Sequence, residues 1–355
     1  KGMEIRNRFM RSATYDRMAD DRGMVTDAST SLYRRLAEGG VGLIVTGHAF
    51  VSPQGQAGVR QYGICSDEMI PGLRRLTEAV HATGGKIVAQ LSHAGINTRF
   101  LAEQGITALT PSSREESKVP QRSMTEEDIE ATIADYGLAA GRAKEADFDA
   151  IQLHGAHGFL LSQFLSPIFN QRTDRWGGSP ENRRRFHIQV VKEVRRRVGE
   201  SYPILMKFGV MDDQSGGTTL EEGIETARQM VVAGLDALEI SAGAGGRPVR
   251  AVLAGSEEKP YFRERTAAAK KAVSVPVMEV GGIRSLTMAQ VIVDSGEADM
   301  ISISRPLIRE PGLIARWQRE SQSPSRCISC SRCFWVMEHE GFLGCYRELH
   351  PDATD

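Results

Sequence analysis

Two histidines three residues apart are the feature of the sequence that most directly suggests chemistry. A short apolar run, Ala150–Leu153, ends on His154, and His157 follows after a Gly-Ala pair. Imidazoles placed just past the end of a strand can direct their ring nitrogens into one pocket and donate hydrogen bonds there. A lone strand-end histidine is more often a core residue, but Gly155 and Gly158 beside this pair favour a ligand site.

Further polar residues stand where other buried strands are expected to end. Gln90 offers an amide that donates and accepts, and Lys207 offers a positive charge. Gly281-Gly282 and Ser304-Arg305 follow the last two apolar runs, where backbone N–H groups and a cation suit a phosphate. A flavin ring needs an amide at its pyrimidine edge, a cation near N1 and O2, and histidine donors over the face where the substrate binds. These residues therefore predict an FMN site.

Eight alternations of a strand and a helix are expected to position these groups. The strands are short apolar runs at residues 7–13, 41–45, 86–91, 150–153, 203–208, 237–240, 277–280 and 300–304. The helices cover residues 29–38, 67–83, 125–146, 183–198, 219–233, 262–272, 286–294 and 311–319. Runs that are apolar throughout are typical of a parallel sheet covered on both faces. Eight such units favour an α/β fold of the TIM (β/α)8 barrel type, whose active site lies at the carboxyl ends of the strands.

The domain organisation follows from this pattern. A doubly wound sheet would need a Gly-x-Gly-x-x-Gly turn after the first strand, but residues 11–14 read Arg-Ser-Ala-Thr. We assign residues 1–320 to an FMN-binding barrel and residues 321–355 to a short extension that contains a cysteine cluster. Residues 92–124 are expected to form a long irregular loop with a functional role. Thr125 and Asp128 have the spacing of a capping box at the start of the next helix.

Bulk composition excludes several classes of protein. The chain has 355 residues, of which 41% are hydrophobic, enough for a large buried core. Its 44 basic residues balance 45 acidic ones, so bulk charge implies no nucleic-acid partner. No apolar run approaches the roughly 20 residues of a membrane span, and no secretory leader is visible. We therefore expect a cytoplasmic protein with no membrane partner.

Four of the five cysteines lie between residues 327 and 345. The spacing Cys327-x2-Cys330-x2-Cys333-x11-Cys345 is typical of thiolate metal ligands. The alternatives are a [4Fe–4S] cluster, a structural zinc ion, or reduced cysteines with no metal.

Taken together, these motifs resemble the old yellow enzyme family of FMN-dependent ene-reductases, and most closely the barrel domain of 2,4-dienoyl-CoA reductases. The similar segments are, in order, residues 7–8 with Ser12, and residues 53–55, 90–95, 154–158, 164–167, 172–183 and 304–306. The resemblance implies an NAD(P)H-driven reduction of activated alkenes. In that reaction His154 and His157 would polarise a substrate carbonyl, so that hydride from flavin N5 reaches the β carbon.

The resemblance also implies roles for individual residues and partners. FMN would contact the residues Ser12, Ala13, Thr14, Gly47, Gln90, Lys207, Gly281, Gly282, Ser304 and Arg305. The partners would be a small molecule with an activated double bond and a nicotinamide that reduces the flavin in the same pocket. A homo-oligomer is left open. In the dienoyl-CoA reductase branch the corresponding cysteines carry a four-iron cluster, and this resemblance places iron–sulfur ahead of zinc here. This chain departs from that branch in having one residue fewer between the second and third cysteines.

Two positions depart from the family. Phe159 stands two residues after His157. The family often has a tyrosine at this position, and that tyrosine donates a proton to the α carbon. The phenyl ring of Phe159 has no proton to donate. Tyr15, at the end of the first strand near the expected N5 position, is our candidate substitute; its alternative role is a wall of the substrate pocket. The family usually has arginine at the position of Lys207. Lysine keeps the positive charge but lacks the planar guanidinium fork.

Two other functions remain as alternatives. One is an amine dehydrogenase or demethylase of the same superfamily, in which hydride flows from the substrate to the flavin. The other is a barrel that binds a phosphate-bearing ligand without redox chemistry.

Overall fold

Eight parallel strands close into a barrel in the computed structural model, which describes residues 2–98, 100–115, 117–244, 259–319 and 321–352. Around the barrel they are β1 (Phe9–Arg11), β2 (Leu43–Val45), β4 (Ile87–Ser92), β7 (Ala150–Gly155), β8 (Ile204–Gly209), β9 (Ala237–Ser241), β10 (Val277–Val280) and β11 (Met300–Ile303). β1 closes the ring, because Met10 lies opposite Leu43 on one side and Ser302 on the other. The predicted TIM barrel is confirmed.

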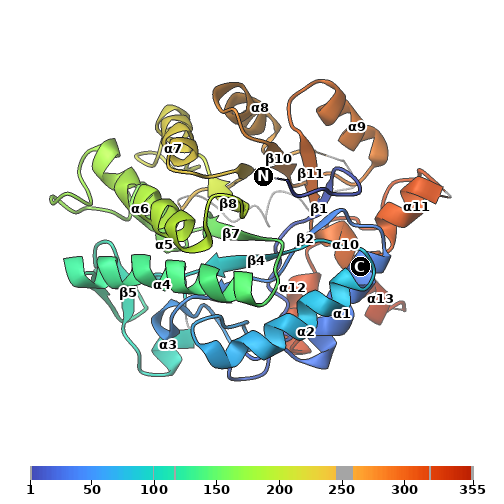
Figure 1. Ribbon diagram of the computed structural model, residues 1–355, viewed down its shortest axis with the longest axis horizontal. Helices are drawn as coiled ribbons and strands as arrows, with labels where there is room; N and C mark the ends of the chain where they lie inside the picture. Colours follow the sequence, from blue (N-terminus) through green and yellow to red (C-terminus); the bar gives the residue numbers. More distant parts are fainter. Residues whose placement is uncertain (1, 99, 116, 245–258, 320, 353–355) are drawn as a thin grey trace.

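Helices surround this barrel (Figure 1). Those that the strand–helix alternation predicts are α1 (Asp27–Glu38), α2 (Ile70–His81), α4 (Glu126–Glu145), α6 (Pro180–Val198), α7 (Leu220–Val232), α8 (Arg263–Ala272), α9 (Leu286–Asp294) and α11 (Leu313–Arg319). The predicted capping box at the start of α4 is confirmed. The Thr125 hydroxyl accepts from the Asp128 N–H, and the Asp128 carboxylate accepts from the Thr125 N–H at 2.8 Å.

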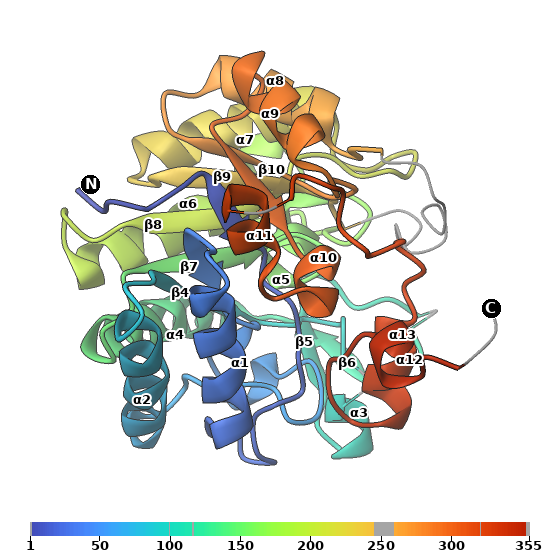
Figure 2. The same ribbon diagram turned by 90° about the vertical axis from the view of Figure 1, so that its right-hand side faces the viewer.

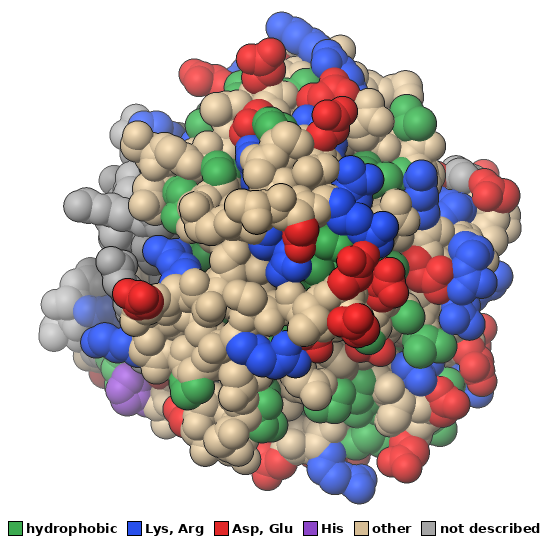
Figure 3. All heavy atoms as spheres, turned by 90° about the vertical axis from the view of Figure 1, so that its left-hand side faces the viewer, with side chains coloured by type: hydrophobic (Ala, Val, Ile, Leu, Met, Phe, Trp, Pro, Cys, Tyr) green, Lys and Arg blue, Asp and Glu red, His purple; other side chains and the backbone are tan. Residues whose placement is uncertain are grey.

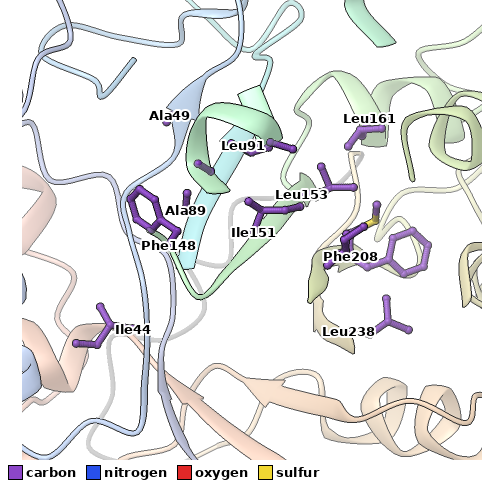
Figure 4. Packing of buried hydrophobic residues seen from close by; sticks show 14 of the residues in the cluster. Ile44, Ala49, Ala89, Leu91, Phe148, Ile151, Leu153, Leu161, Phe208 and Leu238 are labelled. Atoms are coloured by element: carbon purple, nitrogen blue, oxygen red, sulfur yellow. The ribbon is translucent and has the colours of Figure 1, made fainter. Parts of the chain in front are cut away.

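The core has two apolar layers, because successive side chains of a strand point to opposite faces. One layer lies between the strands and the helices and includes Ile44, Ile151, Phe208 and Leu238 (Figure 4). The other takes members from all eight strands and fills the inside of the barrel, with the residues Met10, Leu43, Val45, Val88, Ala150, Leu205, Ala237, Met278 and Met300. Burial of both faces explains why the strands are apolar throughout.

Residues 92–124 are more ordered than predicted. They contain α3 (Phe100–Glu103) and a small parallel sheet of β5 (Ala108–Thr110) and β6 (Gln121–Ser123). The prediction of one irregular loop was therefore wrong for these residues. The strands are only three residues long and pair with each other rather than with the barrel, so their sequence carries little periodic signal.

Several short elements at the strand ends were also not predicted. They are β3 (Ala49–Phe50), the 3-10 helices Pro53–Gly55 and Asp67–Met69, α5 (Leu160–Leu165) and α10 (Arg305–Arg309). α5 begins directly after the predicted histidine segment, and α10 begins at Arg305, within the predicted phosphate segment.

The C-terminal extension packs on the segments that follow β1 and β3. It contains α12 (Cys333–His339) and α13 (Tyr346–Leu349), drawn in red in Figures 1 and 2. The Leu343 N–H donates to the Asp16 carbonyl at 2.9 Å, and Arg17 donates to the Met337 carbonyl at 2.9 Å. The predicted boundary residue, 320, lies outside the described residues, so the division into barrel and extension stays a prediction.

Two properties of the whole chain bear on its partners. Within the described ranges, no helix combines the length and the apolar character that a membrane crossing requires. On the face shown in Figure 3, basic and acidic side chains are interspersed, in keeping with the near balance of charges in the sequence.

Candidate active site

A layer of polar side chains lies inside the barrel, two residues beyond the apolar layer on six of the strands. We call it the polar layer; its members are Ser12, Gln90, Gln152, Lys207, Glu239 and Ser302, and each is almost fully buried. Side chains at positions i and i+2 of a strand point to the same face, so the layer sits on the apolar layer toward the carboxyl ends of the strands. Gln152, Glu239 and Ser302 were not singled out by sequence analysis.

Glu239 is the centre of the polar layer. Its carboxylate accepts from the Ser12 hydroxyl at 2.7 Å, from the Ser302 hydroxyl at 2.6 Å and from Gln152 Nε2 at 2.8 Å. Lys207 Nζ lies 3.2 Å from Oε1 of the same carboxylate. Burial raises the pKa of Glu239, but the Lys207 charge and these hydrogen bonds outweigh burial, so the pKa lies below its ordinary value. Glu239 is therefore an anion at neutral pH.

The same network joins two residues that sequence analysis predicts at the flavin ring. Lys207 Nζ donates to the Ser12 hydroxyl at 2.6 Å. Gln90 Nε2 donates to Gln152 Oε1 at 2.7 Å, and Gln152 in turn donates to Glu239. Lys207 and Gln90 thus belong to one hydrogen-bonded unit, although 117 residues separate them in the chain (207 − 90).

Beyond the polar layer lies a group of rings that we call the histidine wall: Tyr15, His48, His154, His157 and Phe159. The His154 ring stacks on Phe159 with centroids 4.2 Å apart and meets the His157 ring edge-on at 5.2 Å. Nδ1 of His154 is buried and has no hydrogen-bond partner among the described residues. Burial, and then the nearby His157, His48 and Lys207, hold the pKa of His154 well below its ordinary value. The ring is therefore neutral at pH 7 and carries one N–H donor.

His157 is held in place by the end of β9 and by the loop after β4. Its backbone is in the left-handed region, with φ of 59°, which costs a non-glycine residue about 1 kcal/mol or more. Its N–H donates to the Ala242 carbonyl at 3.0 Å, and its Nε2 lies 2.7 Å from the Ser241 hydroxyl. Asn97 Nδ2 donates to the His157 carbonyl at 2.9 Å. These contacts fix the ring next to His154.

His48 belongs to the wall and was missed by sequence analysis. The Ala57 N–H donates to Gln61 Oε1 at 2.7 Å, so Gln61 Nε2 is the atom that faces His48 Nδ1, also at 2.7 Å. Nδ1 must then accept, which places the ring proton on Nε2. Burial, aided by the Lys207 charge, lowers the pKa of His48 to about 4. A histidine directly after the Thr46-Gly47 end of a buried strand was the signal that could have found it.

Tyr15 and Phe159 complete the wall. The Tyr15 ring lies 5.1 Å from the His48 ring, and the Tyr15 hydroxyl donates to the backbone carbonyl of Val59. Burial, opposed by Arg17, raises the pKa of Tyr15 to about 12. The Phe159 ring meets His48 edge-on at 5.1 Å and stacks on His154, so it occupies the centre of the wall.

The remaining residues predicted at the flavin ring lie where β1, β2 and β11 end. The Gly47 N–H donates to the Tyr33 hydroxyl at 2.7 Å, and a Cβ added to Gly47 would lie 3.0 Å from the Thr14 carbonyl oxygen. The Thr14 hydroxyl lies 2.8 Å from the Ser304 hydroxyl. Ala13 is partly buried and packs on the apolar layer inside the barrel. The structure thus brings these residues together beside Ser12.

The predicted phosphate residues line one small cavity. Gly281 and Gly282 have φ values of 105° and 79°, and a Cβ added to Gly282 would lie 1.8 Å from the Lys259 carbonyl oxygen, so no side chain fits there. The cavity also touches Ser304 and Arg305. Arg305 donates to the Tyr261 hydroxyl at 3.0 Å. Glycine backbone and a guanidinium around one cavity fit an anion.

The family can now be stated from comparison with known proteins. The sequence matches the NADH:flavin oxidoreductase / NADH oxidase family over residues 1–323. The chain belongs to this family. It is 37% identical to the NADH oxidase of Thermoanaerobacter brockii over 339 residues, which cover 92% of the chain and 51% of that protein. It is 35% identical to the NADPH dehydrogenase of Halalkalibacterium halodurans over 323 residues, 90% of the chain and 91% of that protein.

A solved structure agrees with this assignment. The complex of 2-naphthoyl-CoA reductase with 2-naphthoyl-CoA superposes with a TM-score of 0.88 at 29% identity, covering 96% of the chain and 54% of that protein. The chain thus spans about half the length of this reductase and of the T. brockii NADH oxidase. The predicted resemblance to the old yellow enzyme family is confirmed.

The cysteine segment contacts the cavity that Gly281, Gly282, Ser304 and Arg305 line. Arg305 donates to the Ser329 carbonyl at 3.1 Å and to the Ser331 hydroxyl at 3.0 Å. Burial raises the pKa of Cys333 to about 11, and the charge of Arg305 opposes this rise, while the thiols of the other three cysteines add to it. Across the described residues, however, no group of three or more His, Cys, Asp or Glu side chains is placed to hold a metal ion, so the predicted metal site is not confirmed.

Proposed function

We propose that this chain is an FMN-dependent oxidoreductase, driven by NADH or NADPH, that reduces alkenes activated by a carbonyl group. Bound FMN supplies hydride chemistry between the nicotinamide and the substrate. The observation that carries the proposal is the position of His154. It is a neutral imidazole with an unpartnered ring nitrogen, and it lies two residues beyond the polar layer on β7, with Lys207 opposite it on β8.

The polar layer supplies the ring end of the cofactor site. Lys207 would face N1 and O2 of the flavin, and Gln90 would face its pyrimidine edge. Both side chains are already held by hydrogen bonds within the chain, so binding costs little additional side-chain entropy. Ser12, Ala13, Thr14 and Gly47 would contact the ring from the ends of β1 and β2.

The cavity between β10 and β11 supplies the phosphate end. The backbone N–H groups of Gly281 and Gly282, the Ser304 hydroxyl and the Arg305 guanidinium would hold the phosphate. Tyr261 and the Ser329–Ser331 segment keep the guanidinium at the cavity. A bidentate cation and glycine N–H groups are a common phosphate-binding combination.

The histidine wall supplies the substrate site. His154 and His157 would donate hydrogen bonds to the carbonyl oxygen and stabilise the negative charge that develops there as the β carbon receives hydride. Removal of one donor of this kind typically lowers kcat by about a hundredfold to a thousandfold. The contacts of His157 with Ser241 and Ala242 keep its ring beside His154 while it donates.

Tyr15 is our proposed proton donor to the α carbon. Phe159 occupies the position between His48 and His154 and has no proton to give. The Tyr15 hydroxyl would have to exchange its hydrogen bond with Val59 for one with the substrate. The alternative donor is water.

We also propose that Cys327, Cys330, Cys333 and Cys345 form a thiolate site for a [4Fe–4S] cluster or, less favoured, a structural zinc ion. The support is their spacing along the chain, Cys327-x2-Cys330-x2-Cys333-x11-Cys345. Iron, sulfide and zinc analysis of anaerobically purified protein tests this. Absence of both metals at all four thiols would overturn it.

The main proposal is tested with purified protein loaded with FMN. We expect the flavin absorbance near ~450 nm to bleach when NADH or NADPH is added anaerobically, and to return when an enone is added. Bleaching by an amine and not by a nicotinamide would instead support an amine dehydrogenase. A protein that retains no FMN would leave only the barrel that binds some other phosphate-bearing ligand.

A further inference from the structure

We propose that Glu239 is a positioning residue that sets the charge and the hydrogen-bond polarity of the ring end of the cofactor site. It would do so through Lys207 on one side and through Gln152 and Gln90 on the other. The inference rests on the proposed FMN site, and its test is chosen so that the two can fail separately.

The charge argument begins with the burial of the pair. Glu239 is 0% exposed and Lys207 is 4% exposed, with Nζ 3.2 Å from Oε1. Charges interact several times more strongly inside a protein than in water, so neither residue acts alone on a ligand beside them. A free lysine at this position would favour a negatively charged ring strongly. The pair favours it less, because the carboxylate offsets the ammonium charge.

The polarity argument begins with the carboxylate, which can only accept hydrogen bonds. Gln152 must therefore turn its NH2 group to Glu239, as the 2.8 Å contact of Nε2 with Oε2 requires. Its carbonyl oxygen then faces Gln90 and accepts from Gln90 Nε2 at 2.7 Å. This order leaves Oε1 of Gln90 outside the network, as an acceptor for a ring N–H. Glu239 thus determines which atom Gln90 offers to the ligand.

The two residues of the ion pair should act on bound FMN in opposite directions. Removal of the Glu239 charge leaves the Lys207 charge without its counter-charge, which favours the reduced, more negative cofactor. Removal of the Lys207 charge leaves a buried carboxylate, which disfavours it. A role of Glu239 in packing alone would not produce effects of opposite sign.

The experiment measures the two-electron midpoint potential of bound FMN by anaerobic dye titration, in the wild type and in Glu239→Gln, Lys207→Met and the double variant. We expect a positive shift for Glu239→Gln, a negative shift for Lys207→Met, and a double variant near the wild type. Each single shift should correspond to at least about a tenfold change in one ratio, the dissociation constant of oxidised FMN divided by that of reduced FMN.

Glu279→Gln is the matched control. Glu279 matches Glu239 in burial, but burial raises the pKa of Glu279 to about 8, so the variant controls for loss of a buried acidic side chain and not for loss of a charge. It lies one residue from the interior-facing Met278 on β10 and contacts Thr266 of α8. Its replacement should leave the potential unchanged. Glu239→Asp, which keeps the charge, should stay closer to the wild type than Glu239→Gln does.

An unchanged or more negative potential in Glu239→Gln would overturn the proposal. If Glu239→Gln does not fold, comparison of the double variant with Lys207→Met isolates the effect of the Glu239 charge, and a double variant with a potential no more positive than that of Lys207→Met would overturn the proposal. Failure of the wild type to bind FMN would instead refute the proposed cofactor, which is a different outcome from bound FMN with an unmoved potential.

Discussion

The polar layer and the histidine wall meet on β7, where Gln152 and His154 are two residues apart, and they differ in how their polar groups are satisfied. In the polar layer, Glu239 receives hydrogen bonds from three side chains and an ion pair from a fourth. In the wall, the buried Nδ1 of His154 has no partner in the described part of the chain, and Phe159 has no polar atom at all. The chain's own side chains satisfy the hydrogen bonds of the polar layer, whereas the histidine wall leaves a ring nitrogen for a ligand.

This difference predicts that substitutions in the polar layer act mainly on stability and substitutions in the histidine wall mainly on activity. Changes in the polar layer should leave buried charges or amides unpaired and so destabilise the fold. Changes in the wall should remove few hydrogen bonds of the folded protein and act mainly on the reaction. The predictions that follow test this separation.

The largest expected effect is that of Lys207→Ala on stability. It leaves Glu239 as an unpaired buried charge, which typically costs about 3–5 kcal/mol. Urea denaturation measures the change. Lys270→Ala is the control, because Lys270 pairs with Asp299 at 2.8 Å near the surface, where a pair contributes about 0–1 kcal/mol. Equal losses in the two variants would contradict the account of the polar layer.

The next effect is that of His154→Ala on catalysis. Loss of one donor to the developing oxyanion should slow enone-driven oxidation of the reduced flavin about a hundredfold to a thousandfold. The unfolding free energy should fall by less than in Lys207→Ala, because Nδ1 of His154 makes no hydrogen bond within the described chain. Stopped-flow kinetics and urea denaturation on one sample measure both. A variant as unstable as Lys207→Ala with unimpaired turnover would reverse the comparison.

A smaller effect concerns pH. Burial lowers the pKa of His48 and of His93 to about 4 and that of His187 to about 3 in the folded protein. Because the unfolded pKa is about 6.5, the stability from these neutral rings is present above pH 6.5 and is lost as the pH falls below it. Each ring should contribute up to about 1.4 kcal/mol per pH unit there.

His187→Leu is the variant that checks this pH dependence. Neither ring nitrogen of His187 has a hydrogen-bond partner among the described residues, so the exchange removes a titrating group and no hydrogen bond. Unfolding free energies measured between pH 7.5 and 5 should then fall less steeply than in the wild type. The same slope in both proteins would show that His187 is not held neutral.

The smallest expected effect is that of Tyr15→Phe. If Tyr15 delivers the proton, reoxidation of the flavin by an enone should slow about tenfold, equal to about 1.4 kcal/mol. Reduction of the flavin by the nicotinamide should not change, because that step needs no proton from the wall. An unchanged rate in both steps would assign the proton to water and leave Tyr15 as a wall residue.

The fold was predictable because it rests on local patterns. Apolar runs, helix spacing and the Thr125 cap all act over a few residues, and the structure confirms them. The predicted ring and phosphate residues also lie together, because a parallel barrel gathers the carboxyl ends of its strands. By contrast, the strands β5 and β6 pair across ten residues of turn-rich chain with no periodic signal.

The partners within the site were not predictable in the same way. Glu239 contacts Ser12 across 227 residues and Gln152 across 87 residues. The sequence shows only a charged residue inside the apolar run Ala237–Ile240, which signals a buried role without naming a partner. In the same way, nothing before the structure linked Arg305 to the cysteine segment that holds its guanidinium. Long-range pairing is a property of the closed barrel.

The measurement that tests the central claim most directly is a spectral titration of the FMN-loaded protein with a phenol. A phenolate oxygen would accept hydrogen bonds from His154 and His157 while its ring lies on the flavin, which produces a long-wavelength charge-transfer band. We predict this band in the wild type and its loss in the His154→Ala, His157→Ala double variant, with FMN still bound. A band that persists in the double variant, or a wild type that takes up no FMN, would contradict the account.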